Sequence, residues 1–196
     1  MALKFSGARV HPPPEPTVVV SLMLRLPRAY LHILARNRDD LGQIINLANE
    51  MIAEDIIFER FITALFLKLS PEQGAFSYVS AGHPPGLVFD QSGEIKHQLR
   101  RTGMPLGMAA SSNYSGSPLV TLQKGDLVVL YTDGIDETMA PTEEFFGIEG
   151  IQKTVRENIS KPAADIVRLL YQACRQFAQD QPQLDDVTIV VLKVVS

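Results

Sequence analysis

The chain has 196 residues, of which 45% are hydrophobic and 20% are charged, a balance typical of one globular domain with a hydrophobic core. A formal net charge of −4 gives no basic footprint for nucleic acid or an anionic membrane. The single cysteine, Cys174, excludes an intramolecular disulfide. A reducing compartment is the default for such a chain, so we expect a cytoplasmic protein.

The start of the chain changes character at residue 18. Residues 1–17 are expected to form a disordered or linker-like leader, because the prolines at positions 12, 13, 14 and 16 remove backbone donors and favour an extended conformation. The domain itself is expected to cover residues 18–196. Residues 18–35 show a helical pattern that Pro27 should kink. The apolar stretch at 18–24 is too short to span a bilayer, so we expect no membrane partner.

A second helix and a block of strands come next. Apolar residues recur at helical spacing from Leu41 to Ile52, and Asp39 or Asp40 can cap this helix. The sequence pattern then changes to apolar runs separated by turn residues, which is typical of strands. The predicted strands cover residues 61–69, 75–80, 86–90, 94–99, 119–121 and 126–131.

The C-terminal part returns to helices before one last strand. Residues 148–158 and 162–179 are predicted helices, the second with Pro162 at a favourable first-turn position. Cys174 falls in the second helix among apolar residues and is expected to be a buried thiol without a chemical role. Residues 187–195 form a strongly apolar strand. Because helices and antiparallel hairpins occupy separate blocks, the sequence predicts an α+β layered fold rather than alternating βαβ units.

Two aspartates stand beside buried strands. Asp133 follows the strand that ends near Tyr131, and Asp185 precedes the last strand. A carboxylate at a strand end is held by rigid backbone and suits a hard cation, which prefers oxygen ligands. Each aspartate taken alone is better explained by an Asx-type turn. The pair, taken with the motifs below, favours a metal site.

Several short motifs occur in a fixed order along the chain. They are Phe61–Ala64, Ser80–Pro84, Gly103–Gly107, Lys124–Asp126, Tyr131–Ile135 and Asp185–Thr188. Each motif is weak alone, but the ordered set resembles the stage II sporulation protein E-type branch of the protein phosphatase 2C (PPM) superfamily. The resemblance covers about residues 22–195.

The resemblance implies a fold and an activity. The fold would be part of the family's α–β–β–α sandwich, with two antiparallel sheets flanked by helices. The activity would be hydrolysis of phosphoserine or phosphothreonine on a regulatory protein of the anti-sigma-factor-antagonist type, with two Mn²⁺ or Mg²⁺ ions as cofactors. The resemblance carries Asp133 and Asp185 over as metal ligands. Asp186, in the neighbouring motif position, is expected to fix its loop by hydrogen bonding.

Other motif residues have supporting or open roles. The resemblance makes Gly134 a supporting residue, and Gly103 and Gly107 are expected to allow loop conformations that other residues resist. His83 either supplies hydrogen bonds to its turn or transfers a proton to the leaving serine, with the structural role favoured. For the acidic residues that follow Asp133, at positions 136 and 137, a solvated helix start is favoured over support of the metals.

Two segments typical of the family do not occur in this sequence. They are a Gly–Asp–Tyr–Tyr–Asp-like segment and an Asp–x–Ser–Gly–His–Gly-like segment, which supply further metal ligands. The resemblance therefore implies an N-terminally incomplete domain with weak or no activity, and a non-catalytic binding module is the alternative. Sheet edges left by missing strands would promote association, so a homo-oligomer is expected.

Overall fold

The structure is a computed structural model of the chain. It describes residues 3–6, 19–21, 40–55, 61–179, 181–183 and 185–195, with the backbone alone at 3–6, 19–21 and 55. The chain divides into two compact units. The first unit comprises Met1–Arg9, Gly86–Gln98 and Leu122–Ser196, and the second comprises Val10–Pro85 and Leu99–Thr121.

The first unit is built on a five-stranded sheet. Its strand order is β1 (Leu3–Ser6), β9 (Ile189–Val194), β8 (Leu127–Tyr131), β5 (Gly86–Phe89) and β6 (Ile95–Leu99). β8 pairs antiparallel with both β9 and β5, and β1 pairs antiparallel with β9. Every residue of β5 and β8 is buried, which explains why both strands consist almost wholly of apolar residues.

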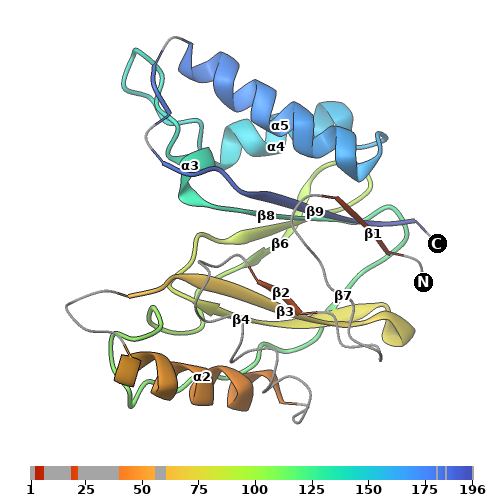
Figure 1. The fold of residues 1–196 in the computed structure, drawn as a ribbon. Coiled ribbons are helices and arrows are strands. Elements are labelled where there is room, and N and C mark those ends of the chain that lie inside the picture. The colour runs from red at the N-terminus through yellow and green to blue at the C-terminus, as the bar shows by residue number, and fades with distance from the viewer. Residues whose placement is uncertain are drawn as a thin grey trace. The chain divides into compact units, whose positions relative to one another are not determined.

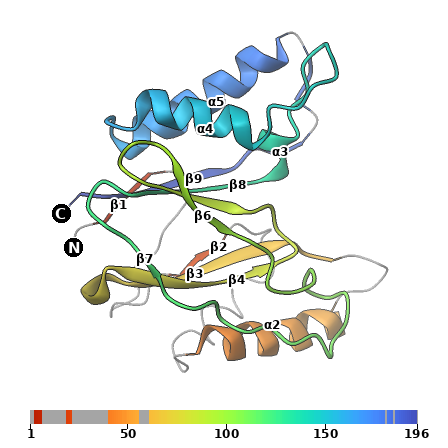
Figure 2. The same ribbon diagram turned by 180° about the vertical axis from the view of Figure 1, so that it is seen from behind.

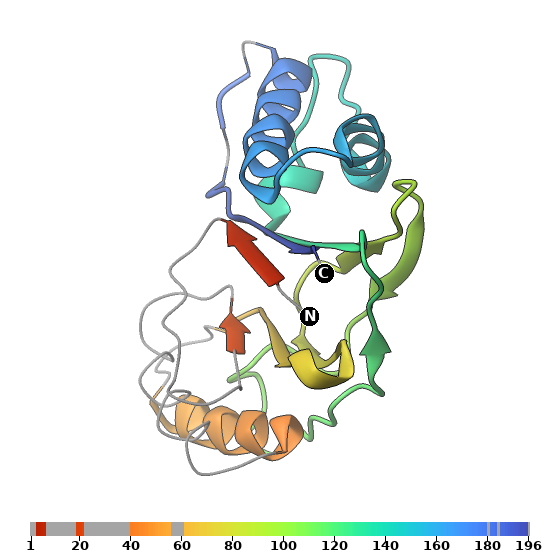
Figure 3. The same ribbon diagram turned by 90° about the vertical axis from the view of Figure 1, so that its right-hand side faces the viewer.

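Three helices belong to this unit. They are the one-turn α3 (Asp133–Asp136), α4 (Gly147–Asn158) and α5 (Ala163–Ala178). Figures 1 and 3 show α4 and α5 side by side on one face of the sheet. Their apolar stripes, which include Ile151, Val155, Ile166 and Leu170, join the buried strand residues in one hydrophobic cluster.

The second unit pairs a four-stranded sheet with one long helix. The strand order is β2 (Val19–Ser21), β3 (Ala64–Ser70), β4 (Ala75–Ala81) and β7 (Val120–Thr121), all antiparallel. The short helix η1 (Pro71–Gln73) makes the turn between β3 and β4. Helix α2 (Leu41–Asp55) lies against this sheet, as Figure 2 shows, and buries Ile44, Ile45 and Ala48.

A polar network fastens residues 103–114 to α2. Asn49 is fully buried, and its Oδ1 accepts the Gly107 N–H at 2.9 Å while its Nδ2 donates to the carbonyl of Ala109 at 2.9 Å. The Tyr114 hydroxyl donates to the carbonyl of Met104 at 2.9 Å. One turn earlier on α2, Asn46 accepts the Tyr114 N–H. Asn46 and Asn49 therefore hold this loop on α2 by hydrogen bonds to its backbone.

The predicted α+β fold with two antiparallel sheets flanked by helices is confirmed. The structure differs from the sequence analysis near the start of the chain. Leu3–Ser6, within the expected leader, form β1, because β9 offers them a ladder that the local sequence does not reveal. Within the expected helix at 18–35, residues 19–21 form β2 on β3, and residues 22–35 lie outside the described residues. No helix in the described ranges is both long enough and apolar enough to span a membrane.

Candidate metal centre

The site is built where β8 ends and β9 begins. The ladder between these strands runs from Leu127, opposite Lys193, to Tyr131, opposite Ile189. One step further, the Thr132 N–H donates to the Thr188 carbonyl at 3.1 Å. The pairing therefore brings the segment after β8 beside the segment before β9, although more than fifty residues separate them in sequence.

Thr132 closes this ladder with its side chain. Its Oγ1 accepts the Thr188 N–H at 2.9 Å and donates to the Asp186 carbonyl, also at 2.9 Å. A hydroxyl has one hydrogen to donate and lone pairs to accept, so Thr132 can make both bonds at once. The segment that carries Asp185 and Asp186 is thus tied directly to the end of β8.

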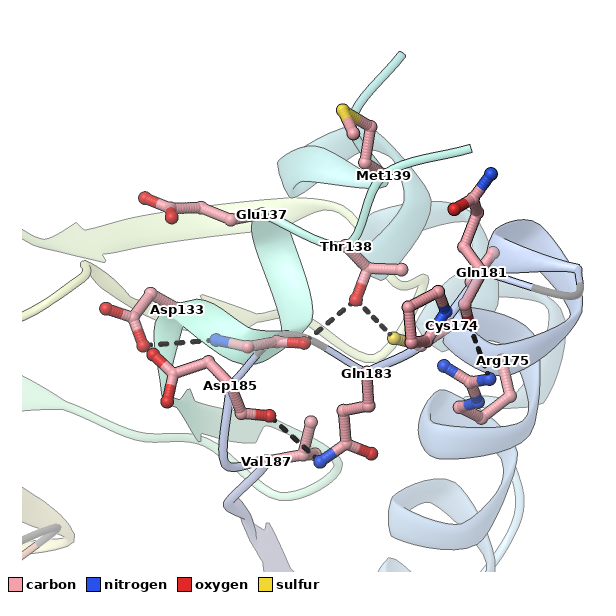
Figure 4. Close-up of a pocket in the computed structure, with 13 residues that line it drawn as sticks. Asp133, Glu137, Thr138, Met139, Cys174, Arg175, Gln181, Gln183, Asp185 and Val187 are labelled. Carbon is pink, nitrogen blue, oxygen red and sulfur yellow. Dashed lines mark hydrogen bonds between the residues drawn. The ribbon is translucent and has the colours of Figure 1, made fainter. Parts of the chain in front are cut away.

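Asp133 and Asp185 line one pocket, with a volume of about 100 Å³, in the first unit. Figure 4 shows their carboxylates at the same end of this pocket. In each residue Oδ1 accepts the N–H of the following residue, at 3.1 Å for Asp133 and 2.7 Å for Asp185. Each aspartate thus bonds to the backbone of its own segment and still lines the pocket.

Gly134 lets the two segments approach closely. A Cβ at this position would lie 2.7 Å from the carbonyl oxygen of Asp186 and 3.2 Å from that of Asp185. Real Cβ atoms essentially never come within 3.0 Å of another atom, and backbone cannot move aside as a side-chain end can. Any other residue would therefore push the Asp185 segment away from Asp133, and the supporting role expected of Gly134 acquires a steric basis.

A short chain of hydrogen bonds leads from Gly134 to Cys174, which also lines the pocket. The Thr138 hydroxyl donates to the Gly134 carbonyl at 2.8 Å and lies 2.8 Å from the sulfur of Cys174 (Figure 4). Cys174 is 1% exposed, and burial raises the pKa of its thiol. The thiol is therefore protonated and packed, as the sequence analysis expects of this cysteine.

Asp136 lies at the end of α3 in a costly environment. Its Oδ1 is buried and has no hydrogen-bond partner among the residues that the structure describes. Burial, followed by the negative charges of Glu137 and Asp133, raises the pKa of Asp136 to about 6. The expected solvated helix start suits the exposed Glu137, whereas Asp136 departs from it, because this residue is half-buried and its Oδ1 is buried.

The residues at this pocket fit a divalent cation in kind. Two carboxylates share one end of it, and neither makes an ion pair within the described part of the chain. Carboxylate oxygens are the ligands that Mg²⁺ and Mn²⁺ prefer. In the ranges that the structure describes, however, no three histidine, cysteine or acidic side chains are grouped as a complete site would require. By their chemistry, these two carboxylates could therefore supply part of a metal site but not a complete one.

Three other candidate residues, Gly103, Gly107 and His83, lie in the second unit. Gly107 has a φ of 83°, in the left-handed region that favours glycine. Gly103 accepts the Gly82 N–H, and a Cβ on it would lie 2.6 Å from the Tyr114 ring. His83 is 2% exposed, with its Nδ1 3.3 Å from the Thr63 hydroxyl. These contacts agree with structural roles, and proton transfer by His83 stays a prediction.

Thr132 and Thr138 were not among the residues predicted from the sequence. Both hydroxyls bond to backbone at the site, and Thr132 does so across 54 and 56 residues of sequence. A threonine beside a motif aspartate is a weak signal by itself. The sequence feature that could have identified Thr132 is its position just after a buried strand, where the backbone hydrogen bonds of the sheet must end.

Comparison with known proteins gives consistent results. The profile of the family Stage II sporulation protein E (SpoIIE) matches residues 20–195. Protein IcfG of Synechocystis sp. is 31% identical over 149 residues, which are 76% of this chain and 23% of IcfG. Phosphoserine phosphatase RsbU of Bacillus subtilis is 28% identical over 152 residues, which are 78% of this chain and 44% of RsbU. The chain thus spans less than half the length of these curated relatives.

Solved structures share the fold. The SiaA-PP2C domain of Pseudomonas aeruginosa superposes with a TM-score of 0.78 at 16% identity, over 97% of this chain and 80% of that one. The PP2C phosphatase domain of SpoIIE from Bacillus subtilis, with a fragment of its regulatory domain, gives a TM-score of 0.77 at 14% identity, over 98% of this chain and 58% of that one. The catalytic domain of the phosphatase PstP, solved with two manganese ions, gives 0.68 at 15% identity, over 99% of both chains.

Proposed function

The chain belongs to the stage II sporulation protein E family of the PPM superfamily, and from this membership we propose that it is a metal-dependent protein phosphatase domain. Its substrate is a phosphoserine or phosphothreonine of a regulatory protein, of the anti-sigma-factor-antagonist type. The names of RsbU and of RsbP of Bacillus subtilis, both phosphoserine phosphatases, support this substrate class. The observation that carries the proposal is the meeting of Asp133 and Asp185 at one pocket without a cationic partner among the described residues.

Three residues of the pocket have a role in this function. Asp133 and Asp185 would hold the cation, because their carboxylates come from strand ends whose backbone is fixed by the β8–β9 ladder. When bound, Mn²⁺ or Mg²⁺ supplies the positive charge that activates water and neutralises the phosphoryl oxygens. Arg175 lies on the wall of the same pocket and adds positive charge that attracts an anionic phosphoprotein.

A second candidate function has its own observation. In the described ranges, no group of three potential ligands could hold a metal tightly. That favours a non-catalytic module that binds the phosphorylated regulatory protein.

For the phosphatase, with two carboxylates as ligands, we expect Mn²⁺ to bind with a dissociation constant on the order of millimolar and to support slow hydrolysis. This expectation does not depend on whether the chain forms the proposed homo-oligomer.

The deciding experiment compares variants of the purified chain across a millimolar Mn²⁺ titration. Hydrolysis of p-nitrophenyl phosphate and of a phosphoserine peptide should depend on Mn²⁺ and be lost in Asp133→Ala and Asp185→Ala. The exposed Glu157, on α4 and outside the pocket, provides the control Glu157→Ala, which should hydrolyse both substrates like the wild type. Hydrolysis that survives both aspartate substitutions would refute the site. No hydrolysis, together with binding of the phosphoprotein that Asp133→Ala leaves unchanged, would establish the binding module instead.

A further inference from the structure

The bonds around Thr132 have a geometry that points beyond the two metal-binding aspartates. Its hydroxyl occupies the next position of the β8–β9 ladder and takes the acceptor role that a backbone carbonyl would otherwise have. The same oxygen donates to the Asp186 carbonyl, one residue after Asp185. Thr132 itself is one residue before Asp133. One hydroxyl thus connects the immediate neighbours of both carboxylates.

Gly134 completes this connection from the other side of Asp133. Its α-carbon lies so close to the Asp186 carbonyl that a methyl group would come within 2.7 Å of the oxygen. The Asp185 segment is therefore held toward β8 by the Thr132 hydroxyl and can come that near only because Gly134 has no side chain. Asp133 lies between the two contacts.

We propose that Thr132 is a positioning residue that, together with the bare α-carbon of Gly134, sets the separation of the Asp133 and Asp185 carboxylates for the divalent cation. The inference rests on the proposed function, because it concerns the same pocket. Thr132 does not touch the cation or the substrate; it acts through the backbone on both sides of the site. Loss of such outer hydrogen bonds typically lowers metal affinity by about 10- to 100-fold.

The first test measures Mn²⁺ binding from the electron paramagnetic resonance signal of free Mn²⁺. Thr132→Val keeps the shape but removes both hydrogen bonds, and it should weaken binding about tenfold or more. Thr132→Ser keeps the hydroxyl and should bind within about threefold of the wild type. Gly134→Ala should weaken binding at least as much as Thr132→Val. The control is Thr154→Val on α4, where a buried hydroxyl outside the pocket donates to the Gly150 carbonyl, and it should bind Mn²⁺ normally.

The second test needs no metal. The Thr188 N–H donates to the Thr132 hydroxyl, so its hydrogen exchange should be faster in Thr132→Val and unchanged in Thr132→Ser. Far-ultraviolet circular dichroism of each variant checks that the fold is intact. A folded Thr132→Val with unchanged Mn²⁺ affinity would overturn the positioning role alone, as would equal loss in Thr132→Ser. A wild-type chain that binds no Mn²⁺ at any concentration would overturn the proposed function and the positioning role together.

Discussion

In the second unit, both polar atoms of the buried Asn49 amide bond to the loop at 103–114, whereas in the first unit the half-buried Asp136 keeps a buried oxygen without a partner among the described residues. The amide holds a loop on a helix, and its donor and its acceptor are both hydrogen-bonded. The carboxylate, by contrast, lies beside Asp133 and Glu137, where its charge is disfavoured. The Asn49 amide thus stabilises the fold, whereas the ionised Asp136 carboxylate is kept at a cost to stability, as is common at functional sites.

Among the substitutions that test this comparison, Asn49→Ala is expected to change the free energy of unfolding most. Asn49→Ala removes the acceptor of the Gly107 N–H and the donor to the Ala109 carbonyl, both in the part of the loop that covers α2. Leaving buried polar groups unpaired costs about 1–3 kcal/mol each, so we expect a loss of about 3 kcal/mol in the free energy of unfolding. Urea unfolding measures it. The exposed Asn113 provides the control Asn113→Ala, and an equal loss there would remove the special status of Asn49.

At Asp136, by contrast, a substitution is expected to stabilise the fold. Because its folded pKa is raised to about 6, ionisation destabilises the fold, and the penalty is absent below the unfolded pKa near 3.8 and complete above pH 6. The shift corresponds to about 3 kcal/mol, which partial exposure reduces, so Asp136→Asn should stabilise by about 1 kcal/mol at pH 7.5. The gain should disappear at pH 4. Urea unfolding with EDTA at both pH values measures this.

Asp90, in the same unit, offers the contrasting carboxylate. Hydrogen bonds from Ser92 and from the Glu94 backbone lower the pKa of Asp90. Its stabilisation is therefore present above the ordinary aspartate pKa and is lost as the pH falls through the lower, folded value. Asp90→Asn should destabilise the chain at pH 7.5, and a stabilising effect there would contradict the role given to charge at Asp136.

Tyr114→Phe is a milder change within the second-unit network. It removes the hydroxyl that donates to the Met104 carbonyl at 2.9 Å and keeps the ring that packs against Gly103. We expect a loss of about 1 kcal/mol in the free energy of unfolding, the typical contribution of one buried hydrogen bond. Thermal unfolding measures it, and an effect as large as that of Asn49→Ala would show that the hydroxyl, not the amide, organises the loop.

The smallest effect is expected for a surface ion pair of the first unit. Arg168 and Asp165 lie 2.8 Å apart on α5, with the arginine side chain 66% exposed. Exposed pairs of this kind contribute about 0.5 kcal/mol or less. Arg168→Ala should leave the urea midpoint of unfolding almost unchanged. A loss above about 1 kcal/mol in the free energy of unfolding would mean that this exposed ion pair stabilises the first unit more than such pairs usually do.

Sequence patterns predicted most elements because those elements depend on local periodicity. The stripe from Leu41 to Ile52 became α2, and the apolar run before Asp133 became β8. They also predicted Asp133 and Asp185 as candidate residues, since each stands at a strand end. They did not predict β1, whose pairing partner is at the other end of the chain, nor the bonds of Thr132 to residues 54 and 56 positions away. Such pairings depend on tertiary contacts that no local pattern contains.

The β8–β9 ladder also determines when the pocket can form during folding. Tyr131 and Ile189 pair directly, so the two aspartates meet only after a segment of about sixty residues has closed into a loop. That closure carries an entropic cost, which is offset when residues of α4 and α5 are buried with strand residues in one hydrophobic cluster. The cost grows slowly, by about 0.6 kcal/mol for each doubling of length. Flexible residues inserted at the exposed turn 141–144 should therefore change the melting temperature little, and the segment between the aspartates can vary in length while the pocket stays intact.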